Sequence, residues 1–161
     1  MSQQQSVDGV EFTCTQVEPN RYVLVHRGEM AAPISQVWAL LYDFQRFVGV
    51  LMPTVSFEWL EGGGVNKVPS RYQLTVGDTR LMEELDYRDE REHTLRYHLI
   101  TPGLGMVAYR GEVKLTKAGE GRTRVEYQRD FTMQPGVSAD ALTQLSHQQL
   151  ADLRKHFAKG A

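Results

Sequence analysis

The sequence predicts an α+β fold in which a curved antiparallel sheet of about seven strands wraps around one long C-terminal helix. The first reason is an alternation of apolar and polar residues that continues, with short turns, from about residue 54 to residue 131. The second is a change to helical spacing after Pro135-Gly136. Alternation leaves one face of the sheet apolar, so that face must be buried against the only long helix, and the sheet must curve to do so.

The chain begins with a predicted hairpin. Residues 10–17 and 21–30 alternate apolar and polar side chains around the turn Glu18-Pro19-Asn20. Two short helices are expected next, at residues 33–42 and 45–51, because Pro33 suits a first helical turn and Pro53 ends the second apolar group.

The remaining strands and the last helix follow from the same periodicities. Strands are expected around residues 55–59, 72–76, 81–87, 95–99, 107–115 and 125–131. In the final segment Ser138 is a suitable N-cap and Asp140 lies in the first turn. One helical stripe then contains Leu142, Leu145, Gln149, Leu153 and Phe157.

Length and composition indicate one domain, at residues 10–161, after a flexible N-terminus at residues 1–9. The net charge of −2 over 161 residues argues against a nucleic-acid partner. The single cysteine, Cys14, excludes an intramolecular disulfide. Because no signal peptide or membrane span is recognisable, we expect a cytoplasmic protein without stable membrane insertion. We also expect a monomer or weak homodimer, and no cofactor.

Several strings resemble the SRPBCC or START-like helix-grip superfamily, and most closely its bacterial polyketide cyclase/dehydrase and lipid-transport family. They are AAPISQVWALLYDF (31–44), GDTRLMEELDYRDEREHTLRYHL (77–99) and YRGEVKLTKAGEGRTRVEYQRDF (109–131), within a similarity that runs from about Tyr22 to Phe157. The sequence departs from the family at Tyr72, where many members carry an arginine, and at Arg129, where a small residue is more usual.

The resemblance implies a deep cavity between the sheet and the last helix. Across the superfamily such cavities hold lipids, sterols, hormones, quinones or polyketides. Most members bind or carry their ligand, and a minority catalyse cyclisation, dehydration or hydrolysis.

Strand alternation predicts a row of polar side chains inside this cavity. Glu83, Tyr97, Tyr109, Tyr127 and Arg129 share the inward parity of Leu85, Leu99 and Val107. If the hairpins turn near residues 90 and 103, Glu83 lies opposite Tyr97, Tyr97 lies opposite Tyr109, and Arg129 comes next. Glu83 and Arg129 would then be about 14 Å apart and unable to pair directly.

The roles of these residues remain open at the level of sequence. Glu83 either orients a ligand through hydrogen bonds or, with a pKa raised by burial, acts as a candidate catalytic acid or base. Arg129 either binds a ligand carboxylate or phosphate or forms an interior salt bridge. Trp38, Phe57, Trp59 and Tyr72 either line the mouth of the cavity or belong to the core.

Three functions are therefore considered. The first is a binder or carrier of a small hydrophobic ligand such as a lipid, polyketide or quinone. The second is a polyketide cyclase or dehydratase that uses Glu83 or a tyrosine. The third is a coenzyme Q-binding or ribosome-associated interaction module, because such relatives share a segment of the type FVGVLMP (47–53).

Other motifs carry no site. The five histidines show no metal-binding spacing within one predicted element. The glycines at 62–64 lack the Lys-Ser/Thr pair of a phosphate-binding loop, and those at 103 and 105 join two strands. The glycines at 62–64 are expected to form a flexible loop that acts as a gate. Those at 103 and 105 either supply the positive φ of a turn or form a lid at the cavity entrance.

Overall fold

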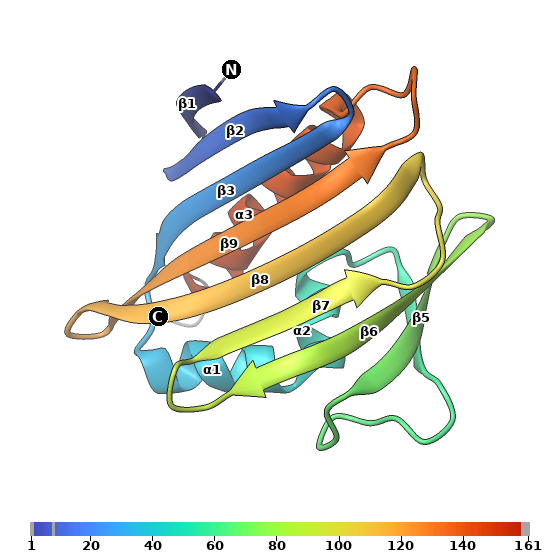
Figure 1. Ribbon diagram of the computed structural model, residues 1–161. Coiled ribbons are helices and arrows are strands. Elements are labelled where there is room, and N and C mark those ends of the chain that lie inside the picture. Colours follow the sequence, from blue (N-terminus) through green and yellow to red (C-terminus); the bar gives the residue numbers. More distant parts are fainter. Residues whose placement is uncertain (1, 8, 159–161) are drawn as a thin grey trace.

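The computed structural model describes residues 2–7 and 9–158 and confirms the α+β class (Figure 1). Its strands are β1 (Ser2–Val7), β2 (Val10–Glu18), β3 (Arg21–Met30), β4 (Ser56–Trp59), β5 (Ser70–Val76), β6 (Thr79–Asp89), β7 (Thr94–Leu99), β8 (Met106–Gly119) and β9 (Arg122–Met133). Its helices are α1 (Ile34–Tyr42), α2 (Phe44–Leu51) and α3 (Asp140–Ala158).

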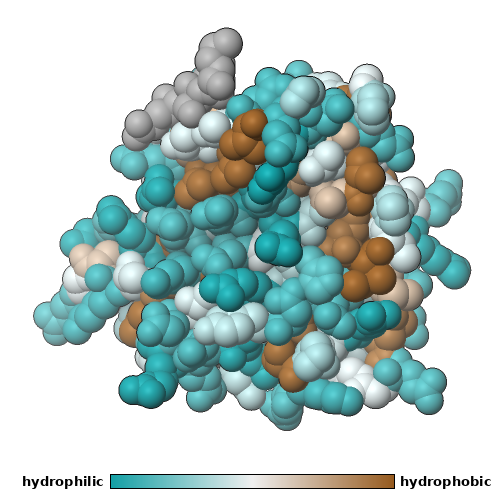
Figure 2. Space-filling view, viewed as in Figure 1, coloured by the Kyte–Doolittle hydropathy of each residue, from teal (hydrophilic) through white to brown (hydrophobic). Residues whose placement is uncertain are grey.

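All the strands form one antiparallel sheet in the order β1-β2-β3-β9-β8-β7-β6-β5-β4. The three helices lie on the same face of this sheet, with α3 running behind β3 and β9 (Figure 1). The opposite face is mostly hydrophilic (Figure 2). This is the division that strand alternation predicts, since one face packs on the core and the other meets solvent.

The described sheet has nine strands rather than about seven. The additional strand at the start is β1, which pairs residue by residue with β2 from Ser2↔Thr15 to Val7↔Val10. No strand had been expected there, because this polar segment has no alternation of apolar and polar residues. The two helices after the hairpin begin and end within one residue of the prediction.

Strand β3, near the start of the chain, pairs with β9, the last strand. Leu24 lies opposite Arg129 and His26 lies opposite Tyr127. A local reading of hairpins cannot find this contact, because about 100 residues separate the partners. It places the first hairpin beside the last strand, under α3.

The core consists of two clusters on the concave face. The larger one joins α1 and α2 to β5, β6 and β7, with Leu41, Leu85 and Leu95 fully buried. The smaller one lies under the start of α3, around Leu24 and Phe131. None of the helices in residues 2–7 and 9–158 combines the length and the hydropathy that crossing a bilayer requires.

The predicted register of the polar row was wrong by two residues. Glu83 lies opposite Leu99, and Tyr97 lies opposite Gly111. The cause is that both hairpins turn later than predicted. Pairs near the first turn, such as Asp89↔Thr94, centre between residues 91 and 92, and those of the second hairpin centre on residue 104. A bulge in β6 between Leu85 and Tyr87 moves the Glu83 pairing one position back toward the prediction. The inward parity of these residues survives because the partner changes and the face does not.

Val107 was predicted to point inward, and this was wrong because a second bulge lies between Met106 and Ala108. Val107 is 48% exposed, whereas Met106 is buried in its place. The extra residue reverses the alternation at the start of β8, and Tyr109 then resumes the inward parity.

Gly111 provides a test of the observed register. It pairs with Tyr97 on one side and with Arg129 on the other, and a Cβ atom at this position would collide with the Tyr97 ring. We expect Gly111→Ala to lower the free energy of unfolding by about 1 to 3 kcal/mol, because overpacking moves a buried ring. Urea denaturation measures the change.

Gly49→Ala is the matched control. Gly49 lies in α2, and a Cβ there meets no atom within 4 Å. Alanine in a helix should therefore raise the unfolding free energy by about 0.5 to 1 kcal/mol. Equal effects of the two substitutions would contradict the packing of Tyr97 on Gly111.

Candidate functional site

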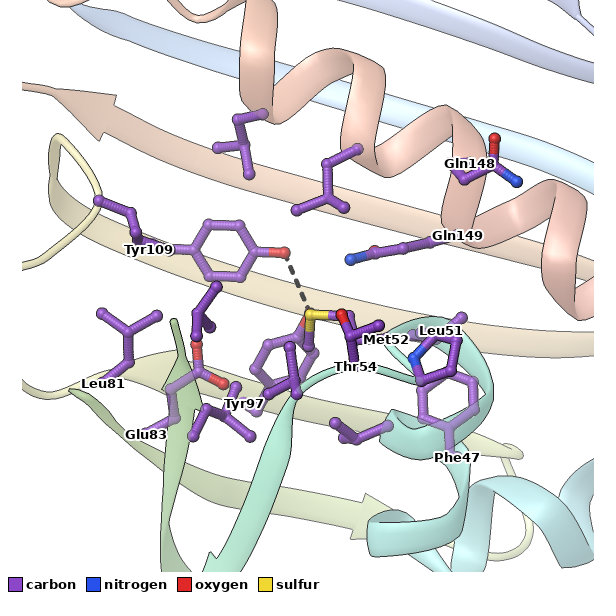
Figure 3. A pocket seen from close by; sticks show the side chains of 18 of the residues that line it. Phe47, Leu51, Met52, Thr54, Leu81, Glu83, Tyr97, Tyr109, Gln148 and Gln149 are labelled. Atoms are coloured by element: carbon purple, nitrogen blue, oxygen red, sulfur yellow. Dashed lines mark hydrogen bonds between the residues drawn. The ribbon is translucent and has the colours of Figure 1, made fainter. Parts of the chain in front are cut away.

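A cavity of about 260 Å³ lies between the concave face of the sheet, α2 and α3. Figure 3 shows side chains that point into it from α2, β6, β7, β8 and α3. Its walls are mostly apolar and include Phe44, Phe47, Val48, Leu51, Met52, Pro53, Val55, Leu74, Val76, Leu81, Leu104, Met106, Leu142 and Leu145. Its polar lining consists of Thr54, Tyr72, Glu83, Tyr97, Tyr109, Tyr127, Gln148, Gln149 and Asp152.

The structure brings five of the ten residues predicted from sequence to the cavity wall. They are Tyr72, Glu83, Tyr97, Tyr109 and Tyr127. The other five, Arg129, Phe57, Trp59, Leu85 and Leu99, are not part of its lining. Arg129 contacts three residues that are, Tyr109, Tyr127 and Gln149.

Aromatic stacking explains why Phe57 and Trp59 stay outside the cavity. Both rings pack on Tyr72 and Phe44, with ring centroids 4.9 Å apart for Phe57 and Tyr72. Trp38 packs edge-on against His93 instead. These aromatic residues therefore belong to the core rather than to the mouth.

Glu83 is a buried carboxyl group with one hydrogen-bond partner among the described residues. Its side chain on β6 is opposite Tyr72 on β5, and the Tyr72 hydroxyl donates to Glu83 Oε1 over 2.8 Å. The residue is 6% exposed. Burial raises the pKa of Glu83 to about 7, although the bond from Tyr72 and the nearby His98 act in the other direction. The carboxyl group is therefore protonated in a large fraction of molecules at neutral pH.

The tight turn between β5 and β6 contained the signal for this pair. Gly77 and Asp78 form a two-residue loop, so counting back from Val76 and Thr79 places Tyr72 opposite Glu83. The sequence prediction had assigned Tyr72 to the cavity mouth or the core without using this count.

Three tyrosine hydroxyl groups meet at the centre of the cavity wall. The Tyr97 hydroxyl is 3.0 Å from that of Tyr109 and also contacts that of Tyr127. Figure 3 shows Tyr97 and Tyr109 on this wall, facing α3 and its Gln149. Burial raises the pKa of Tyr97 and of Tyr127, so both remain neutral hydroxyl groups.

Arg129 lies immediately behind this wall and is 1% exposed. Its Nε donates to the Tyr109 hydroxyl over 3.0 Å, and one terminal nitrogen donates to Gln149 Oε1 over 2.5 Å. The guanidinium carbon lies 3.6 Å from the centre of the Tyr127 ring. No ion pair with a carboxylate is found for Arg129 among the described residues, so the interior salt bridge considered from sequence does not form with Glu83.

A histidine pair lies beside Arg129 and was missed by the sequence analysis. His26 on β3 and His147 on α3 share a hydrogen bond of 2.7 Å, and Phe12 packs against both rings. Burial, the Arg129 charge and His147 lower the pKa of His26 to about 3, so its ring is neutral. Spacing within one element cannot reveal such a pair, since it depends on how the helix docks on the sheet.

Solved structures with the same fold are numerous, and three of them show how this fold is shared at low sequence identity. A protein from Nitrosospira multiformis is 21% identical with a TM-score of 0.69, over 84% of this chain and 95% of the other. One from Thermobifida fusca is 19% identical with a TM-score of 0.72, over 85% and 93%. Truncated norcoclaurine synthase from Thalictrum flavum is 16% identical with a TM-score of 0.62, over 84% and 94%.

A comparison with curated proteins gives no match. At these identities the solved structures establish the fold alone. A family model provides the assignment, because the one described as polyketide cyclase / dehydrase and lipid transport matches residues 24–158. These residues include every strand from β3 to β9 except the first three residues of β3, together with the three helices, and the chain therefore belongs to this family.

Proposed function

We propose that the protein binds and carries a small hydrophobic molecule in the cavity between the sheet and α3. The observation that supports this most is a cavity of about 260 Å³ with apolar walls and a few polar groups that converge on it. Sites for small molecules commonly combine these two features, since apolar burial provides affinity and a few polar groups fix orientation.

The polar groups divide the cavity wall into two parts. Glu83 and Tyr72 form a hydrogen-bonded pair on β5 and β6. Tyr97, Tyr109 and Tyr127 form the other group on β7, β8 and β9, backed by Arg129. A ligand that satisfies both groups has a defined direction in the cavity.

The segment at residues 47–53 supports a ligand-binding role over an interaction module. Phe47, Val48 and Leu51 are buried, and all three line the cavity. A docking surface for a ribosomal partner would need such apolar groups to point outward, whereas binding of coenzyme Q itself would be one case of a hydrophobic ligand in the cavity. Here they complete the wall opposite the sheet.

Native mass spectrometry of the freshly purified protein, followed by denaturing extraction, tests the proposal directly. A retained hydrophobic molecule in a fixed ratio to the protein would support carriage and identify the ligand. When no molecule is retained, titration with the neutral apolar dye N-phenyl-1-naphthylamine measures whether the cavity accepts one. Absence of binding in both experiments would contradict the proposal.

A second candidate function is catalysis by Glu83. It is favoured by one observation, a buried carboxyl group that lines the cavity with a pKa of about 7, the value that suits proton transfer near neutral pH. The name norcoclaurine synthase indicates that at least one protein of similar fold is an enzyme.

The molecules retained by the wild type and by Glu83→Gln distinguish the two functions. A catalyst that has lost its acid or base would retain an unconverted precursor, heavier by one water if the reaction is a dehydration. A carrier would retain the same molecule in both forms.

A substitution that fills the cavity tests where the ligand binds. Val76 is half-buried on β5 and lines the cavity, so Val76→Trp should occupy ligand volume and weaken N-phenyl-1-naphthylamine binding by at least about tenfold. Thr75→Trp is the matched control, because Thr75 is the next residue on the same strand and faces the other side of the sheet. Its dissociation constant should stay within about twofold of the wild type. Equal weakening by both variants would place the dye outside the cavity.

The raised pKa of Glu83 predicts a characteristic dependence of stability on pH. The pKa is 4.5 for the ordinary side chain and about 7 in the folded protein. Between these values the folded protein holds a proton that the unfolded chain has released, so the free energy of unfolding falls as pH rises through this range. The fall amounts to about 3 kcal/mol and is complete above about pH 7.

Glu83→Gln should remove this contribution and keep an acceptor for the Tyr72 hydroxyl. The unfolding free energy of the wild type minus that of the variant should therefore decrease by about 3 kcal/mol from about pH 4 to about pH 8. Chemical denaturation at several pH values measures the difference. A difference that does not change with pH would show that Glu83 titrates normally.

A further inference from the structure

Arg129 is a buried cation whose charge is not matched by a carboxylate among the described residues. Its three described contacts are the Tyr109 hydroxyl, the Gln149 amide oxygen and the Tyr127 ring. The second terminal nitrogen, Nη1, is buried and has no hydrogen-bond partner in the described part of the chain. An unpaired buried charge is costly, and the cost falls when a negative group comes close.

The acidic groups of the cavity are engaged elsewhere. Glu83 accepts the hydrogen bond from Tyr72, and Asp152 accepts one from Gln148, the residue one helical turn earlier on α3. Neither forms an ion pair with Arg129. Within the described chain, no carboxylate therefore offsets the charge of Arg129, and a bound anionic group would do so.

Arg129 also determines what its neighbours present to the cavity. A guanidinium group has only donors, so the oxygen of Gln149 must face it and the amide NH₂ group must point away. Gln149 lines the cavity, and Figure 3 shows its amide nitrogen directed into it, toward Tyr109.

The tyrosine group adds a further donor. Three hydroxyl groups carry three protons, and the two bonds among Tyr97, Tyr109 and Tyr127 use two of them. The Tyr109 hydroxyl accepts the hydrogen bond from Arg129, so that bond uses none of the three hydroxyl protons. One hydroxyl proton and the Gln149 NH₂ group remain available at the cavity wall.

This end of the cavity is therefore rich in donors and lies against a positive charge. Such a surface favours an oxygen that carries negative charge, since charge-assisted hydrogen bonds are stronger than neutral ones. The apolar remainder of the wall favours a hydrocarbon body. Glu83, three strands away on β6, has only the neutral Tyr72 hydroxyl as a hydrogen-bond partner among the described residues, so that part of the wall does not favour a second negative group.

We infer that the ligand is an amphiphile with one carboxylate, and that the carboxylate lies at the Arg129, Tyr109 and Gln149 end of the cavity while its hydrocarbon part covers the apolar wall. This inference rests on the proposed function and names the chemical class of ligand for the same site. It assigns Arg129 to the residues that select the ligand's charge.

The test compares decanoate with decanol, which share a chain length and differ in charge. Each displaces N-phenyl-1-naphthylamine from the wild-type protein, and the displacement gives its dissociation constant. Decanoate should bind at least about tenfold more tightly than decanol. Arg129→Met should remove this preference by weakening decanoate binding, with decanol binding unchanged or tighter.

Gln149→Glu is a second variant that keeps Arg129 in place. The new carboxylate takes the position of the Gln149 amide oxygen and gives Arg129 an internal partner. Decanoate binding should again fall at least about tenfold. Gln144→Glu is the matched control, because it adds the same charge on an exposed position of α3 outside the cavity lining and should leave the preference intact.

The outcomes separate the inference from the proposed function. If the dye binds but decanoate is not preferred over decanol, or if the two variants lose both ligands equally, the carboxylate inference is overturned and the cavity remains a binding site. If the wild type neither retains a hydrophobic molecule nor binds the dye, the proposed function fails and the inference fails with it. Should Arg129→Met not fold, the Gln149→Glu and Gln144→Glu pair decides the question alone.

Discussion

A single guanidinium group constrains the interior of this protein. Arg129 is almost fully buried, carries a permanent charge and is surrounded by hydroxyl groups, an amide and aromatic rings. Each of these neighbours is attached to a different part of the fold: Tyr109 to β8, Gln149 to α3 and Tyr127 to β9 itself. The docking of α3 on the sheet and the polarity of the cavity wall therefore depend on the same few hydrogen bonds.

The charge also affects groups on the side of Arg129 away from the cavity. Burial is the main cause of the lowered pKa values of His26 and His147, and the Arg129 charge adds to it. The two rings are then neutral and share one hydrogen bond between β3 and α3. Next to Arg129, the helix is therefore attached to the sheet by neutral polar groups.

How much of this could be predicted from sequence depends on the distance over which each feature acts. Alternation determined which face each residue occupies, so Glu83, Tyr97, Tyr109 and Tyr127 were assigned correctly to the interior. Register was not predictable to the same degree, because it depends on where each hairpin turns, and both turns lie later than the alternation alone indicates. The contacts of Arg129 with Gln149, and of His26 with His147, join residues that only the closing of the helix on the sheet brings together.

The pairing of Tyr97 with Gly111 has a consequence for how the cavity can change in evolution. The ring occupies the space that any side chain at position 111 would need, so the two positions share one volume across neighbouring strands. A relative with a larger residue at 111 should have a smaller one at 97, and would lose the central hydroxyl of the tyrosine group. The same pair of positions would thus change the size of the cavity and its preference for polar ligands in one step, leaving the backbone of the sheet as it is.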